Sequence, residues 1–553
     1  MVFVKRRVDA TRHSRSGGRQ FEEPELNLRS IIVLGLLGWL FVSVGCATPS
    51  LENRRSATLD SNREAIEAAG PPRRVVLITV GGLDSSDFLN SWGHVVNATD
   101  RVRMPTLARL AREGAIGVEA HPPTPGSVYA SHATLATGRL PAQHGVVSDF
   151  ALDREGKRAL PFWDSRLLKG TALWDAAIGR GVLALGWPTT MGARIELVVP
   201  DGEPTNGDKS WLEFIRNRTS PSLLRELEAI AGEAIAARPS NPVEGGIAAW
   251  PTSQERDAAY VELACGIVAS ERDPGLWMIR LNQTASYQHS AGFGSVEVDA
   301  ALGRVDLEIG RLIACLESAG QLADTAIFVT GDVSYRAVHT QIDPNVTLVR
   351  HGLIGRDPRA TLGVRSWLAL VRTNGRSAYV YARDAASAVE ARKVLEEEAA
   401  RTNAFEVVSA ADLAESGADP QAWFGLAANP GFVIGNGLSE PVLRPAARRG
   451  SAGAFPFRDP EASSVGFVAW GRGIRSQVRV PSLDLSDVAP TIAILLGLRL
   501  DDRLDGEAIV GILRAAAVSK PPPGPKRLGV GSDGDVDRAL RELGGGRPLG
   551  RDE

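Results

Sequence analysis

Short apolar runs along the chain alternate with amphipathic stretches. The run VVLITV, at 75–80, ends in turn-forming glycines and predicts a buried strand. Between 104 and 117, Pro105 precedes an amphipathic segment and Gly114 follows it, which predicts a helix with its stop signal. The stretches 172–188 and 298–332 repeat the order helix, glycine, strand. Strands separated by helices predict a mostly parallel sheet that helices cover on both faces.

The longest predicted helix, at 298–320, has one continuous apolar face. The residues on that face are Leu302, Val305, Ile309, Leu312, Ile313 and Leu316. A smaller unit then interrupts the pattern from about 344 to 450, with predicted strands at 366–373 and 377–383 and an amphipathic helix at 385–402. We interpret this unit as an inserted α+β cap. The sheet pattern resumes with a strand at 465–474 and a helix at 487–498.

The N-terminal 46 residues combine a basic leader with an uncharged apolar run from Ile31 to Gly45-Cys46. This layout is typical of a secretory signal. The Gly45-Cys46 junction resembles a bacterial lipobox, in which Cys46 would be acylated, although Ser43 is an imperfect residue for its first position. An uncleaved anchor is a second interpretation, because the run approaches the lower limit of ~17 residues for a span. A buried core helix is a third.

Either of the first two interpretations makes the protein extracytoplasmic and attaches it to a membrane through residues 1–46. We expect a polar linker at 47–72, a main domain at 73–515 with the cap inside it, and a Pro- and Gly-rich disordered tail at 516–553. The abundance of Gly, Ala and Arg suits a bacterium of high genomic GC.

Charge and cysteine content narrow the picture further. The 62 Lys and Arg nearly balance the 65 Asp and Glu, so the net charge of −3 gives no support for a nucleic-acid partner. Cys265 and Cys315 both fall in predicted helices. They could form a disulfide in an oxidising compartment. The interpretation we favour from the sequence is that each is a small core residue.

Seven groups of motifs occur in an informative order. They are VVLITVGGL, MPTLARLAREGA, PGSVYASHATLATGRLPAQHGVV, ALWDAAIGRG with GWPTTMGA, DLEIGRLIACLESAG with FVTGD, DPNVTLVRHGLI, and VAWGRGI with DVAPTIAILLGL. Together they resemble the type I phosphodiesterase/nucleotide pyrophosphatase branch of the alkaline-phosphatase-like superfamily, from about Arg74 to about Leu513. The resemblance implies an α/β/α sandwich around a mostly parallel sheet with an inserted cap. It also implies two zinc ions held by Asp and His, and a Thr or Ser nucleophile that the metal activates.

Carried over residue by residue, the resemblance places this machinery on substituted positions. The strand-end Asp falls on Gly81, and the nucleophile falls on Val128, four residues before His132. The seven family positions are Gly81, Val128, Ala285, His289, Asp332, Val333 and Ala452. His289 and Asp332 alone keep ligand-competent side chains, and in the family scheme they belong to different metal sites. Since a catalytic zinc normally takes three protein ligands, the sequence predicts that the metal site is lost.

Residues beside these positions have alternative interpretations. Ser127 and Tyr129 flank Val128, and a slip of one residue would present Ser127 as a weak alternative nucleophile, although without metals it lacks activation. His132 and His144 match positions that we take to be structural, and we expect hydrogen-bonded packing roles for both.

His289 is either an orphan core histidine or a residue with a retained function. A buried Asp332 needs a partner, and we expect it to pair with His289 or Arg336. Asp84 and Asp87 lie three and six residues after Gly81. That displacement moves their side chains off the strand tip, so we expect them at the surface.

Three functions are compatible with the sequence. The first is a catalytically degenerate, extracytoplasmic member of the family, without a cofactor, that binds or scaffolds an unknown protein or small-molecule ligand. The second is a working phosphodiesterase or phosphatase that holds two zinc ions with rearranged ligands. The third is an envelope structural protein whose fold is only inherited.

Overall fold

A computed structural model describes residues 70–96, 102–152, 159–162, 164–202, 211–216, 218–236, 252–359, 363–459, 464–501 and 503–517. The leader with Cys46, the linker up to 69 and the tail from 518 lie outside the described residues. Within the described ranges, no helix has both the length and the hydropathy that a membrane span requires.

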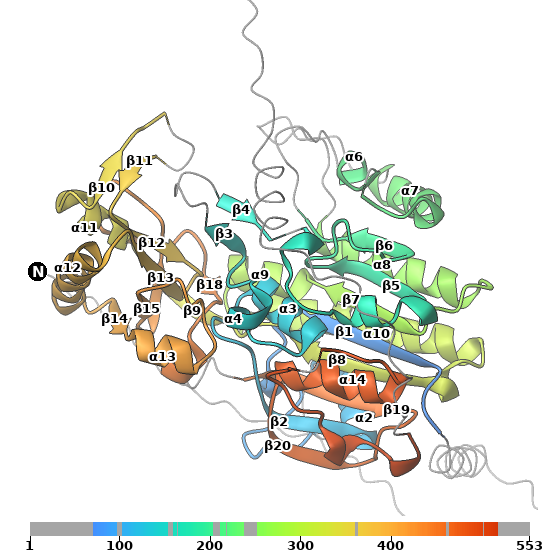
Figure 1. Cartoon of the computed structure of the whole chain (residues 1–553). Helices are drawn as coiled ribbons and strands as arrows, with labels where there is room; N and C mark the ends of the chain where they lie inside the picture. The colour runs from blue at the N-terminus through green and yellow to red at the C-terminus, as the bar shows by residue number, and fades with distance from the viewer. Residues whose placement is uncertain are drawn as a thin grey trace, which may run out of the picture. The chain divides into compact units, whose positions relative to one another are not determined.

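The centre of the fold is an eight-stranded sheet in the order β20-β2-β19-β8-β1-β7-β5-β6 (Figure 1). Neighbouring strands are parallel except in the two pairs that β19 makes. The prediction of a mostly parallel sheet is therefore confirmed. The strands are β1 (Arg74–Val80), β2 (Ala115–His121), β5 (Val182–Trp187), β6 (Leu197–Pro200), β7 (Leu276–Leu281), β8 (Thr325–Gly331), β19 (Val465–Gly471) and β20 (Val478–Asp484).

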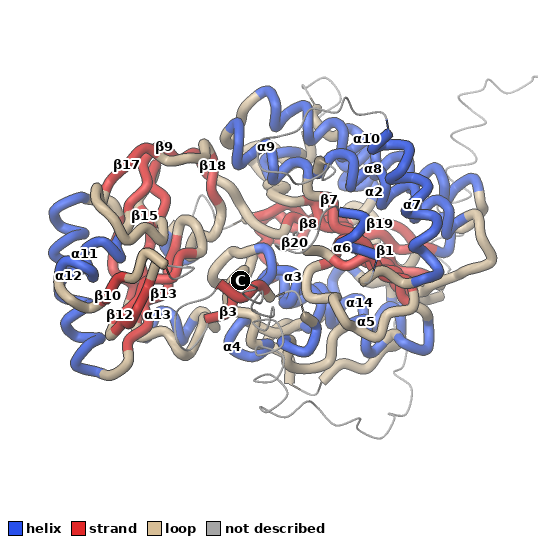
Figure 2. The backbone as a smooth tube through the Cα atoms, turned by 90° about the horizontal axis from the view of Figure 1, so that it is seen from above, coloured by secondary structure: helices blue, strands red, loops and turns tan. Residues whose placement is uncertain are grey.

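Helices cover both faces of this sheet, as Figure 2 shows from above. In β1, Val76, Ile78 and Val80 belong to the core on one face, while Val75 and Leu77 belong to the core on the other. Because both faces are buried, β1 is a continuous apolar run rather than an alternating one. One face is covered by α2 (Pro105–Glu113), α7 (Pro221–Ala236), α8 (Ser253–Val268) and α10 (Val296–Ser318), and the other by α3 (Val128–Thr137), α5 (Leu173–Ala176) and α14 (Val488–Leu496).

The long helix α10 buries all six residues of its predicted apolar face. It is also joined covalently to α8, because Cys265 and Cys315 form a disulfide with an S–S distance of 2.09 Å. The interpretation of two separate core thiols is therefore wrong. Both cysteines pack against the apolar core as well, so a periodic helix pattern alone could not distinguish the two arrangements.

A smaller unit lies beside the central sheet, on the left in Figures 1 and 2. Its elements begin at β9, a few residues before the expected 344, and end at β18. It contains one sheet in the order β12-β13-β15-β14, a second sheet in the order β16-β9-β17 with β18 paired to β9, and the hairpin β10-β11.

The helices of this unit are α11 (Pro344–Arg350), α12 (Ala385–Thr402) and α13 (Ala410–Glu415). Its strands are β9 (Arg336–Ile342), β10 (Ile354–Arg356), β11 (Val364–Trp367), β12 (Ala369–Thr373), β13 (Ser377–Ala382), β14 (Phe405–Val408), β15 (Phe424–Ala428), β16 (Gly431–Ile434), β17 (Leu443–Pro445) and β18 (Gly450–Ser451). The remaining elements of the core are α4 (Pro141–His144), α6 (Trp211–Arg216), α9 (Gln283–Ala291), β3 (Phe150–Leu152) and β4 (Ala159–Pro161).

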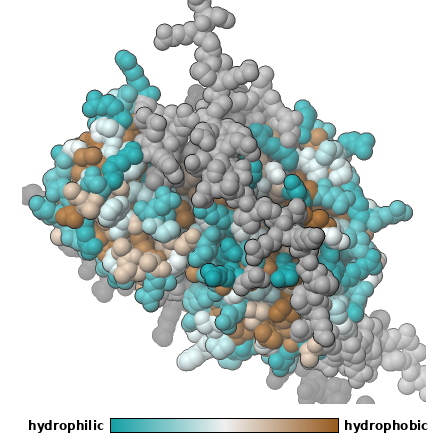
Figure 3. All heavy atoms as spheres, in the orientation of Figure 1, coloured by the Kyte–Doolittle hydropathy of each residue, from teal (hydrophilic) through white to brown (hydrophobic). Residues whose placement is uncertain are grey.

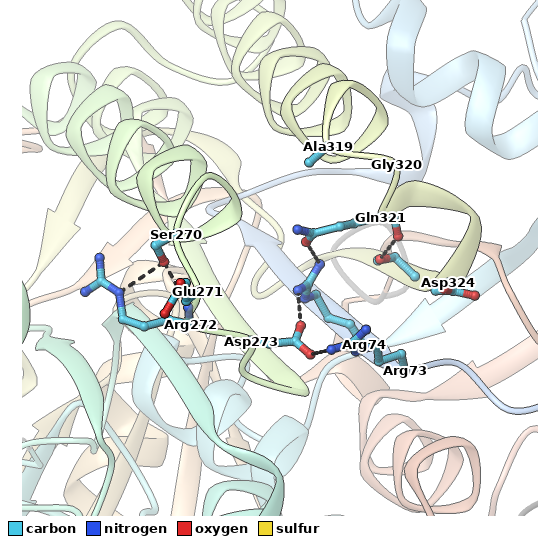
Figure 4. A pocket seen from close by; sticks show the side chains of 11 residues that line it. Arg73, Arg74, Ser270, Glu271, Arg272, Asp273, Ala319, Gly320, Gln321 and Asp324 are labelled. Carbon is cyan, nitrogen blue, oxygen red and sulfur yellow. Dashed lines mark hydrogen bonds and ion pairs between the residues drawn. The ribbon is translucent and has the colours of Figure 1, made fainter.

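The amino end of β1 is fixed by Arg74, which lines a cavity of about 320 Å³ (Figure 4). Its guanidinium donates to Asp273 Oδ1 at 2.6 Å and to Gln321 Oε1 at 2.7 Å. It also lies 4.8 Å from the ring centroid of Trp277. These contacts join the starts of β1 and β7 to the turn that follows α10, at the opposite end of the sheet from the candidate site.

Candidate functional site

The candidate site lies where β1, β7 and β8 end side by side. The last residues of these three parallel strands are register partners, so the residues that follow them, Gly81, Asn282 and Asp332, are neighbours at one edge of the sheet. In an open α/β sheet this edge is where ligands are usually held. Helix α3 is tied to β1 here, because Thr79 Oγ1 lies 2.8 Å from His132 Nε2.

An apolar cluster occupies this edge. Ala285, Val333 and Tyr335 are buried together, and Val128 and Ala452 pack against them. We call these five residues the Tyr335 cluster. Four of its members are positions that the family resemblance assigns to the nucleophile and the metal ligands, and they come from four separate segments of the chain. The structure therefore brings the predicted positions together, with a phenol ring and aliphatic side chains between them.

Gly81 lies against the same cluster, and its close surroundings explain the absence of a side chain. A Cβ at this position would lie 2.7 Å from Asn282 Oδ1 and 2.9 Å from the Cβ of Ala285. An aspartate therefore requires Asn282 to move. The next residue, Gly82, has φ +75°, and its Cβ would lie 2.8 Å from the ring of Tyr335. Both glycines are needed for close approach of backbone to side chain.

Asp332 is fully buried, but it pairs with neither His289 nor Arg336, so that prediction is wrong. Its Oδ1 accepts hydrogen bonds from the backbone N–H groups of Gly82 at 2.9 Å and Val333 at 2.8 Å. Its Oδ2 is buried without a hydrogen-bond partner among the described residues. Burial raises the pKa of Asp332, while the charge of Arg280 and the two N–H groups act in the opposite direction.

The Nη1 atom of Arg336 instead lies 3.4 Å from Oδ2 of Asp84. Asp84 and Asp87 are both buried, which corrects the expectation of surface positions. The two carboxylates close a short 3₁₀ turn: Asp84 Oδ1 accepts from the N–H of Ser86, and Asp87 Oδ2 accepts from the N–H of Asp84. Burial raises the pKa of Asp87 to about 7.

Arg280 is the buried cation of the site. It is the penultimate residue of β7 and is only 8% exposed. Its Nη1 lies 3.1 Å from Asp201 Oδ2, and its Nη2 donates to Asn282 Oδ1 at 2.8 Å. Burial acts to lower the pKa of Arg280, but the charges of Asp201 and Asp332 outweigh burial and raise it. The guanidinium therefore stays ionised inside the protein.

His289, on α9, contacts the chain where it enters and leaves the smaller unit, at Tyr335 and Gly450. Its Nδ1 lies 3.1 Å from the carbonyl oxygen of Gly450, and its Nε2 lies 3.0 Å from the hydroxyl of Tyr335. Because a carbonyl can only accept, Nδ1 carries the proton and Nε2 accepts from the phenol. Burial and the charge of Arg448 lower the pKa of His289 to about 4. The lone pair that a metal would use is thus engaged by Tyr335.

Ser127 and Asp149 lie at the start of α3. The backbone N–H of Tyr129, in the first turn of the helix, donates to Asp149 Oδ1 at 2.9 Å, and the Tyr129 hydroxyl donates to Asp201 Oδ2 at 2.9 Å. Among the described residues the Ser127 hydroxyl has no hydrogen-bond partner of regular geometry, although it is close enough to Asp149 to favour that carboxylate's ionised form. Burial has the larger effect and raises the pKa of Asp149.

His132 and His144 have the packing roles expected of them. His132 Nδ1 lies 2.7 Å from the backbone oxygen of Val128, and His144 Nε2 lies 3.0 Å from Thr134 Oγ1. His144 Nδ1 accepts from the N–H of Val146 at 3.1 Å. Burial lowers the pKa of His132 well below its ordinary value and that of His144 to about 3, so both rings are neutral components of the core.

These side chains do not fit a zinc site. Across the described ranges, no three His, Cys, Asp or Glu side chains are grouped so as to hold a metal ion. His289 uses both ring nitrogens in hydrogen bonds within the protein, and Oδ1 of Asp332 already accepts two. A catalytic zinc normally has three protein ligands and an open position, whereas here the Tyr335 hydroxyl already bonds the Nε2 of His289.

Comparison with known proteins identifies the family. A sequence model of the type I phosphodiesterase/nucleotide pyrophosphatase family matches residues 75–449, which is more than half of the chain. The chain belongs to this family. No curated protein sequence matches it.

Solved structures of the same fold include human ectonucleotide pyrophosphatase/phosphodiesterase 5, with 15% identity and a TM-score of 0.55 over 80% of this chain and 100% of that one. The murine protein, an inactive variant in complex with AMP, has 16% identity and a TM-score of 0.54 over 81% of this chain and 100% of that one. These likenesses support the alkaline-phosphatase-like fold.

Sequence reasoning missed Arg280, Tyr335, Asn282, Asp149 and Asp201. Only the first of these carried a local signal, because an arginine interrupts the apolar strand LWMIRL just before its carboxyl end. A charge in a buried strand needs a partner. Its charged partner, Asp201, comes from a distant segment, so the sequence alone did not identify it.

Proposed function

We propose that this member of the phosphodiesterase/nucleotide pyrophosphatase family does not hydrolyse phosphoesters and instead binds or scaffolds a protein or small-molecule ligand. The observation that supports this most directly is the Tyr335 cluster. Phosphoester hydrolysis by the family's chemistry needs a hydroxyl nucleophile and two metal ions that activate it and neutralise charge. Here aliphatic side chains and a phenol ring occupy the positions assigned to that machinery.

An active hydrolase with rearranged groups is the second candidate, and one observation favours it. The Ser127 hydroxyl lies beside Asp149 at the start of α3, which is the arrangement of a nucleophile with an adjacent general base. However, the same carboxylate already accepts a hydrogen bond from the backbone N–H of Tyr129. The cation that would stabilise negative charge on a phosphoester, Arg280, is already paired with Asp201.

We also propose that the protein acts outside the cytoplasm, attached to a membrane through residues 1–46, with Cys46 as the acylated residue. The disulfide between Cys265 and Cys315 supports this location, because such bonds persist in oxidising compartments.

On the face shown in Figure 3, apolar areas are small and scattered over the smaller unit and the lower part of the core. An envelope structural role is a less specific alternative, and the part of this face that Figure 3 colours shows no large apolar area for it.

The test is metal content and hydrolysis measured on the same preparation. The full-length protein, purified without chelator, is expected to contain close to no zinc by elemental analysis. It is also expected to release no product from bis(p-nitrophenyl) phosphate with added zinc. Two tightly held zinc ions, or turnover above that of a mock preparation, would contradict the proposal. The variant Ser127→Ala separates the two candidates, because turnover that disappears in it would support the rearranged hydrolase.

A further inference from the structure

We propose that Arg448 and Arg449, together with Phe293 and Val296, form a docking surface for an acidic segment of a partner protein. This inference rests on the proposed binding function and names the kind of ligand that it takes. The four residues, which we call the Arg449 surface, come from the loop between β17 and β18 and from the junction of α9 and α10. Figure 2 shows β18 beside α9, between the smaller unit and the central sheet.

The two arginines carry positive charge that no described carboxylate neutralises. Both side chains are exposed, and among the described residues neither forms an ion pair or a hydrogen bond with an acidic group. By contrast, Arg444, in the same segment, pairs with Asp343 at 2.7 Å. Nη1 of Arg448 lies 3.5 Å from Nδ1 of His289, but that nitrogen donates its proton to a backbone carbonyl and cannot accept. Both guanidinium groups can therefore bind an external anion.

The backbone that carries these arginines is held in place by the rest of the protein. The N–H of Arg449 donates to the carbonyl oxygen of His289 at 2.9 Å, and the carbonyl oxygen of Arg449 accepts from the N–H of Val338 at 2.9 Å. The next residue, Gly450, pairs with β9 as part of β18. Because the loop backbone is already ordered, a partner has to immobilise only the arginine side chains, which lowers the entropic cost of binding.

Phe293 and Val296 add an apolar part to the surface. Phe293 is 37% exposed and Val296 is 76% exposed. A turn holds Phe293 at its corner, because the N–H of Ser295 donates to the carbonyl oxygen of Gly292 at 3.3 Å. A Cβ at Gly292 would lie 3.2 Å from the Cβ of Arg449. The aromatic turn and the arginine loop are therefore in contact and form one continuous surface.

This composition favours a protein segment that carries carboxylates beside an apolar side chain. Arginine and aromatic residues are enriched at the positions that contribute most to protein–protein binding. Guanidinium groups bind carboxylates through two parallel hydrogen bonds, and an uncompensated positive surface repels basic partners. A small anion contacts only the guanidinium groups. An acidic segment with an apolar side chain contacts the arginines and Phe293 together, so it uses the whole Arg449 surface.

A peptide selection tests this docking surface. A random peptide library displayed on phage is selected on the full-length protein, and the enriched peptides should carry Asp and Glu close to an apolar residue. One of them, synthesised with fluorescein, is then titrated with protein and followed by anisotropy. The double variant Arg448→Gln/Arg449→Gln should weaken its binding by roughly tenfold or more, because each lost guanidinium leaves a carboxylate unpaired. Phe293→Ala should weaken it as well, and Arg448→Lys/Arg449→Lys, which keeps both charges, should weaken it less.

The matched control is Arg180→Gln/Arg475→Gln, which removes two exposed arginines near the amino ends of the parallel strands. Its affinity for the peptide should equal that of the wild type. Equal weakening in the control, enriched peptides without acidic residues, or no enrichment would overturn the docking surface. Displacement of the peptide by free glutamate as readily as by unlabelled peptide would assign the arginines to small anions and also overturn it. These failures leave the lack of hydrolysis intact, whereas bound zinc or turnover in the wild type would overturn that proposal instead.

Discussion

Lowering the pH is expected to destabilise the protein through His289. The neutral ring accepts a hydrogen bond from Tyr335 at Nε2, and protonation would abolish that acceptor. Its pKa is lowered from 6.5 to about 4 in the folded protein. The unfolded chain therefore takes up a proton below pH 6.5, and the folded chain does not until about pH 4. The stability that this group contributes above pH 6.5 is lost as pH falls through that window.

The full shift from 6.5 to about 4 corresponds to about 3 kcal/mol at roughly 1.4 kcal/mol per pKa unit. Of this, about 2 kcal/mol falls between pH 7 and pH 5. The lowered pKa values of His132 and His144 also make the protein less stable as pH falls. The pH profile of the wild type therefore does not isolate the contribution of His289. The variant His289→Gln keeps a donor and an acceptor but does not titrate. Its deficit relative to wild type in urea unfolding, followed by tryptophan fluorescence, should narrow by about 2 kcal/mol from pH 7 to pH 5. Parallel profiles for the two proteins would refute this account of His289.

Two further outcomes are expected. Gly82→Ala should cost about 1–3 kcal/mol from its positive φ and more from the 2.8 Å contact with Tyr335. Gly294→Ala, at φ +74° in open space, is the matched control that lacks the contact, and equal thermal shifts would count against a tight cluster. Replacing Cys265 and Cys315 together by serine should lower stability by up to about 4 kcal/mol for a crosslink 50 residues apart. Chemical unfolding of reduced wild type should reproduce that loss, and an unchanged midpoint would mean that the thiols are not paired.

The fold was largely predictable because its signals are local. The six-residue apolar face of α10 and the unbroken apolar run of β1 follow directly from periodicity, and both elements form where the sequence predicts them. The order of the family motifs also located the strand ends that carry Gly81 and Asp332. The elements missed or misread depend on partners distant in sequence. The Cys265–Cys315 bond joins two helices that each look complete alone.

Side-chain partners within the site were less predictable for the same reason. Asp332 was expected to pair with His289 or Arg336, but Arg336 contacts Asp84 and His289 bonds Tyr335 instead. The charge that opposes the raised pKa of Asp332 is that of Arg280, which lies 52 residues earlier in the chain, on β7, with β1 between it and β8. Sheet order, rather than sequence distance, therefore decides which charges meet.

Sheet order also explains why the substitutions form a single packed unit. The cluster positions follow β7, β8 and β18 or begin α3, so each side chain is in contact with residues from other segments of the chain. Restoring an aspartate at Gly81 would displace Asn282, and displacing Asn282 would remove a hydrogen bond from Arg280. Restoring one ligand therefore disturbs the hydrogen bonding of Arg280, and several simultaneous changes are needed before a metal could be held. The inertness that we propose for this site is a cooperative property of its packing, and not of any one missing residue.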